Sequence, residues 1–153
     1  MAQPGKRVLA RTLTTREFTG TIAQNAAAFA SLDVKALSLG ENVDALLRAV
    51  TIVSMEDLDW ELWFFTKTGT AGNSAAPDTN TLIGRVVLPT TALQIAATGL
   101  YTFVADALQV QLYDEDRTSK IHMALVNRAA ASKTAGAAGA VRVSLSVEPT
   151  LGW

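Results

Sequence analysis

One histidine and two groups of carboxylates are the residues whose types would allow chemistry in this sequence of 153 residues. His122 lies in an alternating segment, which places its side chain on the strand face opposite Ile121 and Met123. The sequence contains no serine flanked by the glycines of a nucleophile elbow. A single histidine in such a strand is typical of a surface or hydrogen-bonded structural residue, so we expect no Ser-His-Asp triad.

The carboxylates lie in two clusters, residues 56–61 and residues 114–116. Paired carboxylates can hydrolyse glycosidic bonds or bind calcium. In the second cluster, however, Arg117 and Lys120 follow where a calcium-binding loop needs oxygen ligands and a turn glycine. This pattern favours a solvated turn over a calcium site.

The composition excludes most other kinds of site. The chain has no cysteine, which rules out disulfides, thiolate metal centres and cysteine nucleophiles. The glycine-containing stretches 69–72 and 136–139 lack the lysine and hydroxyl residue that end a phosphate-binding loop, and they are too short for a dinucleotide fingerprint. We therefore expect no catalytic residue, no cofactor and no metal ligand, and we interpret the chain as a protein that is not an enzyme.

Aromatic side chains are concentrated in residues 60–65, where Trp60 and Phe64 share one strand face and Trp63 and Phe65 share the other. Aromatic residues on both faces predict a strand in the middle of a sheet. These rings could form a platform for stacking sugars, but packing in the core is the favoured interpretation.

Short strands must position all these groups, because the apolar runs are brief, separated by turn residues and without a sustained period of 3.6 residues. The clearest alternation is in residues 141–147, and a long polar loop of a kind that often carries function spans residues 66–81. We expect roughly seven to nine strands and an all-β, antiparallel β-sandwich. Residues predicted to be buried in its core are Trp60, Leu62, Phe64, Val143 and Leu145.

The first 30 residues differ from the rest of the chain, since they are rich in threonine and poor in bulky apolar side chains. This predicts an extended N-terminal arm over residues 1–30 and a β-sandwich domain over residues 31–153. Residues 1–17 carry a net charge of +3 and the remaining residues −4, although the whole chain is close to neutral at −1. Exposed ion pairs within one chain stabilise it by only about 0–1 kcal/mol each, so we expect the arm to lie along an acidic surface of a neighbouring copy or another protein.

The near-neutral charge argues against nucleic acid as a direct partner. No apolar stretch approaches the length of about 18 residues that a membrane span requires. Residues 1–5 lack the apolar region of a secretory signal. We therefore expect a soluble protein that begins at Met1 and does not contact a membrane.

A set of segments in residues 44–153 carries a family resemblance: residues 50–65, the polar loop after them, residues 83–86, residues 121–128, the Ala/Gly loop to Gly139, residues 141–147 and the ending 148–153. Together they resemble small virion structural proteins of tailed bacteriophages. The resemblance covers residues 44–153 and excludes the basic arm. It implies a jelly-roll-like sandwich that decorates or cements the outside of an icosahedral head, and it implies neither catalytic residues nor a cofactor.

The function implied by this resemblance is that of a bacteriophage capsid decoration protein, also called a cement protein. Such a protein is made in the host cytoplasm, binds the major capsid protein on the exterior of the virion head and stabilises the shell, here as a homo-oligomer with a trimer favoured. A carbohydrate-binding β-sandwich on a phage tail or another virion surface is the alternative, using the aromatic residues or the loop 66–81. Candidate contacts with the capsid or another subunit are Lys6, Arg7, Arg11, Arg16, Phe18 and Trp153.

Overall fold

The computed structural model describes residues 12–18, 20–33, 44–54, 60–67, 81–87, 93–96, 100–118, 120–134 and 141–149. Within these residues the chain forms β-strands and no helix, and all strand pairs are antiparallel. The expected all-β, antiparallel fold is therefore confirmed. The described part of the chain also contains no helix with the length and hydropathy of a membrane span.

The strands form two main sheets and one short strand pair. The larger sheet contains β1 (Thr12–Phe18), β12 (Val141–Pro149), β4 (Asp44–Ser54), β8 (Leu100–Ala105) and β7 (Leu93–Ala96) in that order, with β9 (Val110–Tyr113) also paired to β4. The smaller sheet has the order β3 (Ala27–Asp33), β10 (Lys120–Asn127), β5 (Trp60–Phe65) and β6 (Leu82–Val87). The short pair joins β2 (Thr21–Ile22) to β11 (Lys133–Thr134).

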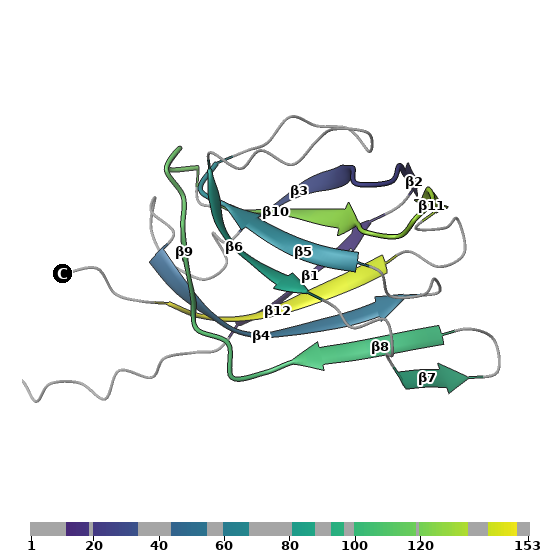
Figure 1. Cartoon of the computed structure of the whole chain (residues 1–153). Helices are drawn as coiled ribbons and strands as arrows, with labels where there is room; N and C mark the ends of the chain where they lie inside the picture. Colours follow the sequence, from purple (N-terminus) through teal and green to yellow (C-terminus); the bar gives the residue numbers. More distant parts are fainter. Residues whose placement is uncertain are drawn as a thin grey trace, which may run out of the picture.

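The two main sheets lie face to face as two layers, with the smaller sheet above the larger one in Figure 1. Side chains from both sheets contribute to one hydrophobic core, so the arrangement is that of a β-sandwich. All five residues predicted for this core are completely buried. The prediction is correct because alternate residues of a strand point to the same face.

The smaller sheet carries clusters of apolar side chains on both faces. The alternate residues Phe65, Ala124 and Val126 belong to a second cluster on the face turned away from the core, where the rings of Phe29 and Phe65 are 5.4 Å apart. β5 lies between β10 and β6, as the aromatic residues on both of its faces predicted.

Some of the pairings between strands distant in sequence are nested. β1 pairs with β12, β3 with β10, β4 with β8 and β9, and β5 with β6, so that each pair encloses the next one along the chain. β8 and β9 run along the same side of β4, the first beside Val50–Ser54 and the second beside Asp44–Leu47. Ala107, which has a φ of 54°, lies between them.

The N-terminal region takes part in these sheets. β1, β2 and the first residues of β3 precede residue 31 and pair with strands from the second half of the chain. The predicted arm over residues 1–30 is therefore not confirmed, and residues 1–11 lie outside the described residues. The threonine-rich segment is extended, as its β-branched residues favour, but it forms an edge strand of the larger sheet.

Candidate functional site

A buried carboxylate organises the turn between β9 and β10. The Oδ2 atom of Asp114 accepts hydrogen bonds from the backbone N–H of Thr118 (2.5 Å), the hydroxyl of Thr118 (2.9 Å) and the backbone N–H of Lys120 (3.2 Å). Its Oδ1 atom accepts from the backbone N–H of Asp116 at 3.2 Å and contacts His122 Nε2 at 3.0 Å. Asp114 thus ties together the backbone of the turn and the first residues of β10.

These hydrogen bonds determine the ionisation state of Asp114. Burial by itself raises the pKa of Asp114, but the hydrogen bonds from His122, Lys120 and Thr118 outweigh it and hold that pKa below its ordinary value. The carboxylate is therefore ionised at neutral pH and can only accept hydrogen bonds. It follows that the Nε2–H group of His122 donates the hydrogen bond to Oδ1 of Asp114.

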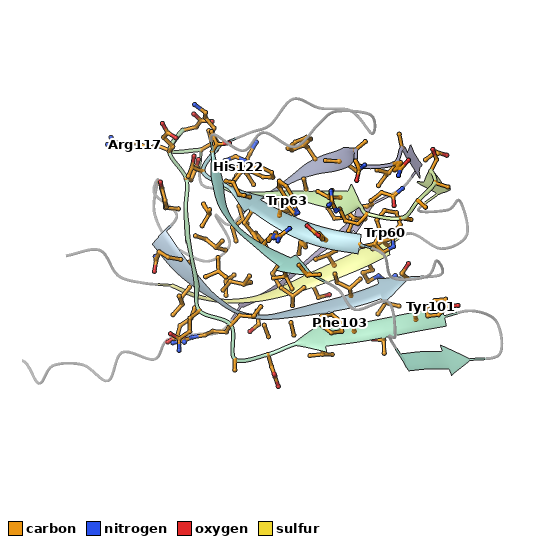
Figure 2. The ribbon with its side chains drawn as sticks, in the orientation of Figure 1. Trp60, Trp63, Tyr101, Phe103, Arg117 and His122 are labelled. Atoms are coloured by element: carbon orange, nitrogen blue, oxygen red, sulfur yellow. The ribbon has the colours of Figure 1, made fainter. Side chains whose placement is uncertain are left out.

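The predicted turn is present, but the prediction that its side chains are solvated is wrong for Asp114. Glu115, Asp116 and Arg117 are exposed, whereas the side chain of Asp114 is completely buried. The sequence pattern could not reveal this, because the groups that bury and bind Asp114 follow from the fold of the turn. His122 is 2% exposed and hydrogen-bonded to Asp114, so the alternative of a surface histidine is wrong. In Figure 2, His122 and Arg117 lie at one end of the sandwich and Trp60 lies towards the other.

The same turn and the adjoining part of β10 contain the one trio of potential metal ligands among the described residues. Asp114, Asp116 and His122 offer ligand atoms that all lie within 4.8 Å of one another. Both oxygens of Asp114 already accept hydrogen bonds, and one of those contacts is to Nε2 of His122. A metal ion would have to break these bonds, so the geometry fits a structural turn better than a metal centre.

A second buried carboxylate lies on the outward face of β5. Glu61 is 7% exposed, and its Oε2 atom accepts hydrogen bonds from the indole Nε1 of Trp63 (2.7 Å) and from Nη1 of Arg85 (3.1 Å). Its Oε1 atom lies 3.5 Å from Nε of Arg128. One carboxylate therefore faces two guanidinium groups, and we call this set of four residues the Glu61 cluster.

The sheet register brings the Glu61 cluster together. Trp63 lies two residues after Glu61 and shares its face, Arg85 is the cross-strand partner of Trp63 on β6, and Arg128 directly follows β10. A further hydrogen bond joins Arg128 Nη1 to Asn25 Oδ1 at 3.1 Å. The cluster has a net charge of +1, and half-exposed guanidinium groups are suited to binding an oxyanion.

Sequence reasoning placed Glu61 in a carboxylate cluster, but it did not identify either arginine. The only signal was a charged residue inside an otherwise apolar strand, which needs a partner when it is buried. Arg85 and Arg128 are 24 and 67 residues away from Glu61, so no local spacing links them to it.

Three of the four aromatic residues considered for a sugar platform are buried, namely Trp60, Phe64 and Phe65. Burial is therefore the correct interpretation for these rings, with Trp60 and Phe64 in the core and Phe65 in the second cluster. Trp63 is half-buried and lies on β5 near the middle of the smaller sheet in Figure 2. Residues 68–80 of the predicted loop lie outside the described residues.

The predicted contact residues are distributed differently from the expectation. Phe18 is only 3% exposed and packs in the core of its own chain, so its side chain does not face a partner. This is a correction, and its reason is that β1 continues the larger sheet. Arg16 lies in β1 opposite Val143. The remaining predicted contacts, Lys6, Arg7, Arg11 and Trp153, lie outside the described residues.

Comparison of the sequence with models of protein families and with curated proteins found no match.

Proposed function

We propose that this chain is a bacteriophage capsid decoration protein that binds the major capsid protein on the outside of the head and stabilises the shell. The observation that carries this proposal is the nested pairing of β1 with β12, β3 with β10, β4 with β8 and β9, and β5 with β6. Nested pairing of this kind across two layers supports a jelly-roll-like sandwich, an architecture used by viral capsid proteins and lectins. The sequence resemblance to phage virion structural proteins is consistent with it.

The use of buried polar residues also supports a structural role. Asp114 and His122 order a turn, and Glu61 holds two arginines in place. A decoration protein acts through mass action, because each bound copy stabilises the closed lattice by RT ln(1 + [L]/Kd) per site relative to a lattice that does not bind it. Such a function requires a rigid body and a binding surface.

The attachment is proposed to involve the basic N-terminus and a homo-oligomeric, preferably trimeric, assembly. Lys6, Arg7 and Arg11 precede β1, and Arg16 lies within that edge strand. With Trp153, these cations are the proposed contacts with the capsid or a neighbouring subunit. The protein would be made in the host cytoplasm and would be located on the virion exterior, without direct contact with nucleic acid or membrane.

The proposal is tested by imaging purified virions of the encoding phage with and without this chain by electron cryomicroscopy. We expect density on the head exterior that is lost in virions lacking the chain and restored when the purified protein is added back. Heads lacking the chain should also release DNA at a lower temperature. Identical heads in the two preparations would contradict the proposal.

A carbohydrate-binding sandwich on a phage tail or another virion surface is the second candidate. It is favoured by the half-buried Trp63 beside two half-exposed arginines, since lectin sites combine an aromatic ring with fixed polar groups. A glycan array with the purified chain separates the candidates. Specific glycan binding, together with antibody labelling of tails instead of heads, would favour this second function.

A further inference from the structure

We infer that Arg85 and Arg128 of the Glu61 cluster bind a carboxylate side chain, aspartate or glutamate, of a protein partner. The first reason is the charge balance. One guanidinium is enough to neutralise Glu61, but the cluster contains two, and no other charged group contacts them among the residues that the structure describes. The second guanidinium leaves the cluster one positive charge in excess.

The two guanidinium groups face solvent while their inner atoms are held. The side chains of Arg85 and Arg128 are 52% and 47% exposed, whereas that of Glu61 is 9% exposed. Arg85 is bound to Glu61 through Nη1, and Arg128 uses Nε and Nη1 for Glu61 and Asn25. Within the described part of the chain, the Nη2 groups of both arginines have no hydrogen-bond partner, so they can donate outwards.

The cluster is organised before any ligand arrives. Trp63 donates to Glu61, and Glu61 orients both arginines. An arginine that is already held loses less conformational entropy when it binds, and its planar fork matches the two oxygens of a carboxylate. Glu61 is thus a positioning residue, and the arginines are the binding groups.

The surroundings favour a protein carboxylate over a phosphate or a sugar acid. A carboxylate carries one negative charge and matches the excess of +1, whereas a phosphate dianion would place surplus negative charge beside the buried Glu61. Val87, the cross-strand partner of Glu61, is 55% exposed and adds an apolar contact next to the arginines. Arginine beside an apolar and an aromatic residue is the composition of protein interfaces, whereas a sugar needs several further polar groups for its hydroxyls.

This inference names the chemistry of the partner surface, and in that respect it rests on the proposed function. The test uses the purified chain and small probes, so its outcome is separate from that of the virion experiment. A lack of head density would leave a carboxylate site intact, and a lack of carboxylate binding would leave head density unaffected.

The experiment is a titration followed by NMR of the Trp63 indole N–H and of the Arg85 and Arg128 Nε–H groups. The probe is glutamate capped at both ends, and capped glutamine at the same ionic strength is its uncharged control. We expect saturable shifts of these signals with capped glutamate only. Arg85→Gln and Arg128→Gln should each weaken binding by at least about tenfold, because each removes a charge-assisted hydrogen bond.

The control variant is Arg117→Gln, which removes an exposed arginine at the turn between β9 and β10 and should leave the affinity unchanged. If Arg85→Gln does not fold, Arg85→Lys retains the charge without the planar fork and should bind more weakly than the native chain. Equal responses to capped glutamine, or shifts that never saturate, would overturn the inference. Tighter binding of N-acetylneuraminic acid or inorganic phosphate would overturn the assignment to a protein carboxylate.

Discussion

At the scale of single residues, five hydrogen-bond donors converge on the buried carboxylate of Asp114. The side chain cannot be replaced without leaving donors unpaired, because water does not reach it. We predict that Asp114→Asn lowers the free energy of unfolding by about 3 kcal/mol, since hydrogen bonds to charged groups contribute about 1.5–3 kcal/mol each. Urea unfolding measures this loss. Asp116→Asn at the exposed neighbouring position should change stability by less than about 0.5 kcal/mol, and equal effects of the two variants would contradict the role assigned to Asp114.

The lowered pKa of Asp114 also predicts how stability depends on pH. A carboxyl group whose pKa is lower in the folded state contributes stability above its unfolded pKa, and this contribution is lost as the pH falls through the folded pKa. The free energy of unfolding of the native chain should exceed that of Asp114→Asn by a constant amount from pH 7 to about 5, and we call this difference the stability advantage. It should then shrink below the ordinary value of 3.8. Urea unfolding at pH 7, 5, 4 and 3 tests this, and an advantage that grew towards pH 3 would refute it.

At the scale of elements, β5 joins the core to the outward face of the smaller sheet. Phe64 is completely buried, and its neighbours in the core come from both sheets. Phe64→Ala should therefore lower the free energy of unfolding by roughly 3–5 kcal/mol, because it removes apolar contacts and leaves a cavity. The exposed Val104→Ala on β8 is the control and should have little effect. An unchanged unfolding midpoint for Phe64→Ala would show that the register of β5 is wrong.

The segment between β8 and β9 contains Ala107, whose backbone is in the left-handed conformation with a φ of 54°. A side chain there is strained by roughly 1–2 kcal/mol, whereas glycine adopts this conformation readily. We predict that Ala107→Gly raises the free energy of unfolding by up to about 1 kcal/mol, after its greater loss of chain entropy is subtracted. Ala130→Gly at another exposed position, which has no positive φ, should instead lower stability by roughly 0.5–1 kcal/mol. Thermal unfolding of both variants compares them directly.

At the scale of the whole molecule, the basic residues before β1 are proposed to attach the sandwich to an acidic surface. Deleting residues 1–11 removes Lys6, Arg7 and Arg11 but keeps β1 and its pairing with β12. We predict a folded protein that binds heads more weakly and with less dependence on salt, because exposed charges are screened by added ions. Co-sedimentation with heads across a salt series measures both effects.

A full-length variant in which these three cations are replaced by glutamine separates charge from chain length. It should show the same loss of salt dependence as the deletion. Binding by the shortened protein that equals native binding at every salt concentration would contradict attachment through this segment.

Much of the fold could be predicted from local patterns. The alternation in residues 60–64 and 141–147 determined which side chains enter the core, because the side-chain period of a strand is the same in any sheet. The orientation of His122 opposite Ile121 and Met123 was also encoded locally.

The sequence by itself therefore determined the fold class, the core-facing residues and the exclusion of cysteine chemistry. Only the tertiary structure decided that β1 completes the larger sheet, that Asp114 is buried, and that Glu61 meets Arg85 and Arg128. The physical reason is that strand pairing joins residues far apart in sequence, and both burial and charge pairing depend on which strands become neighbours. A local pattern states which face a side chain occupies, but the other layer and the neighbouring strands decide what it meets there.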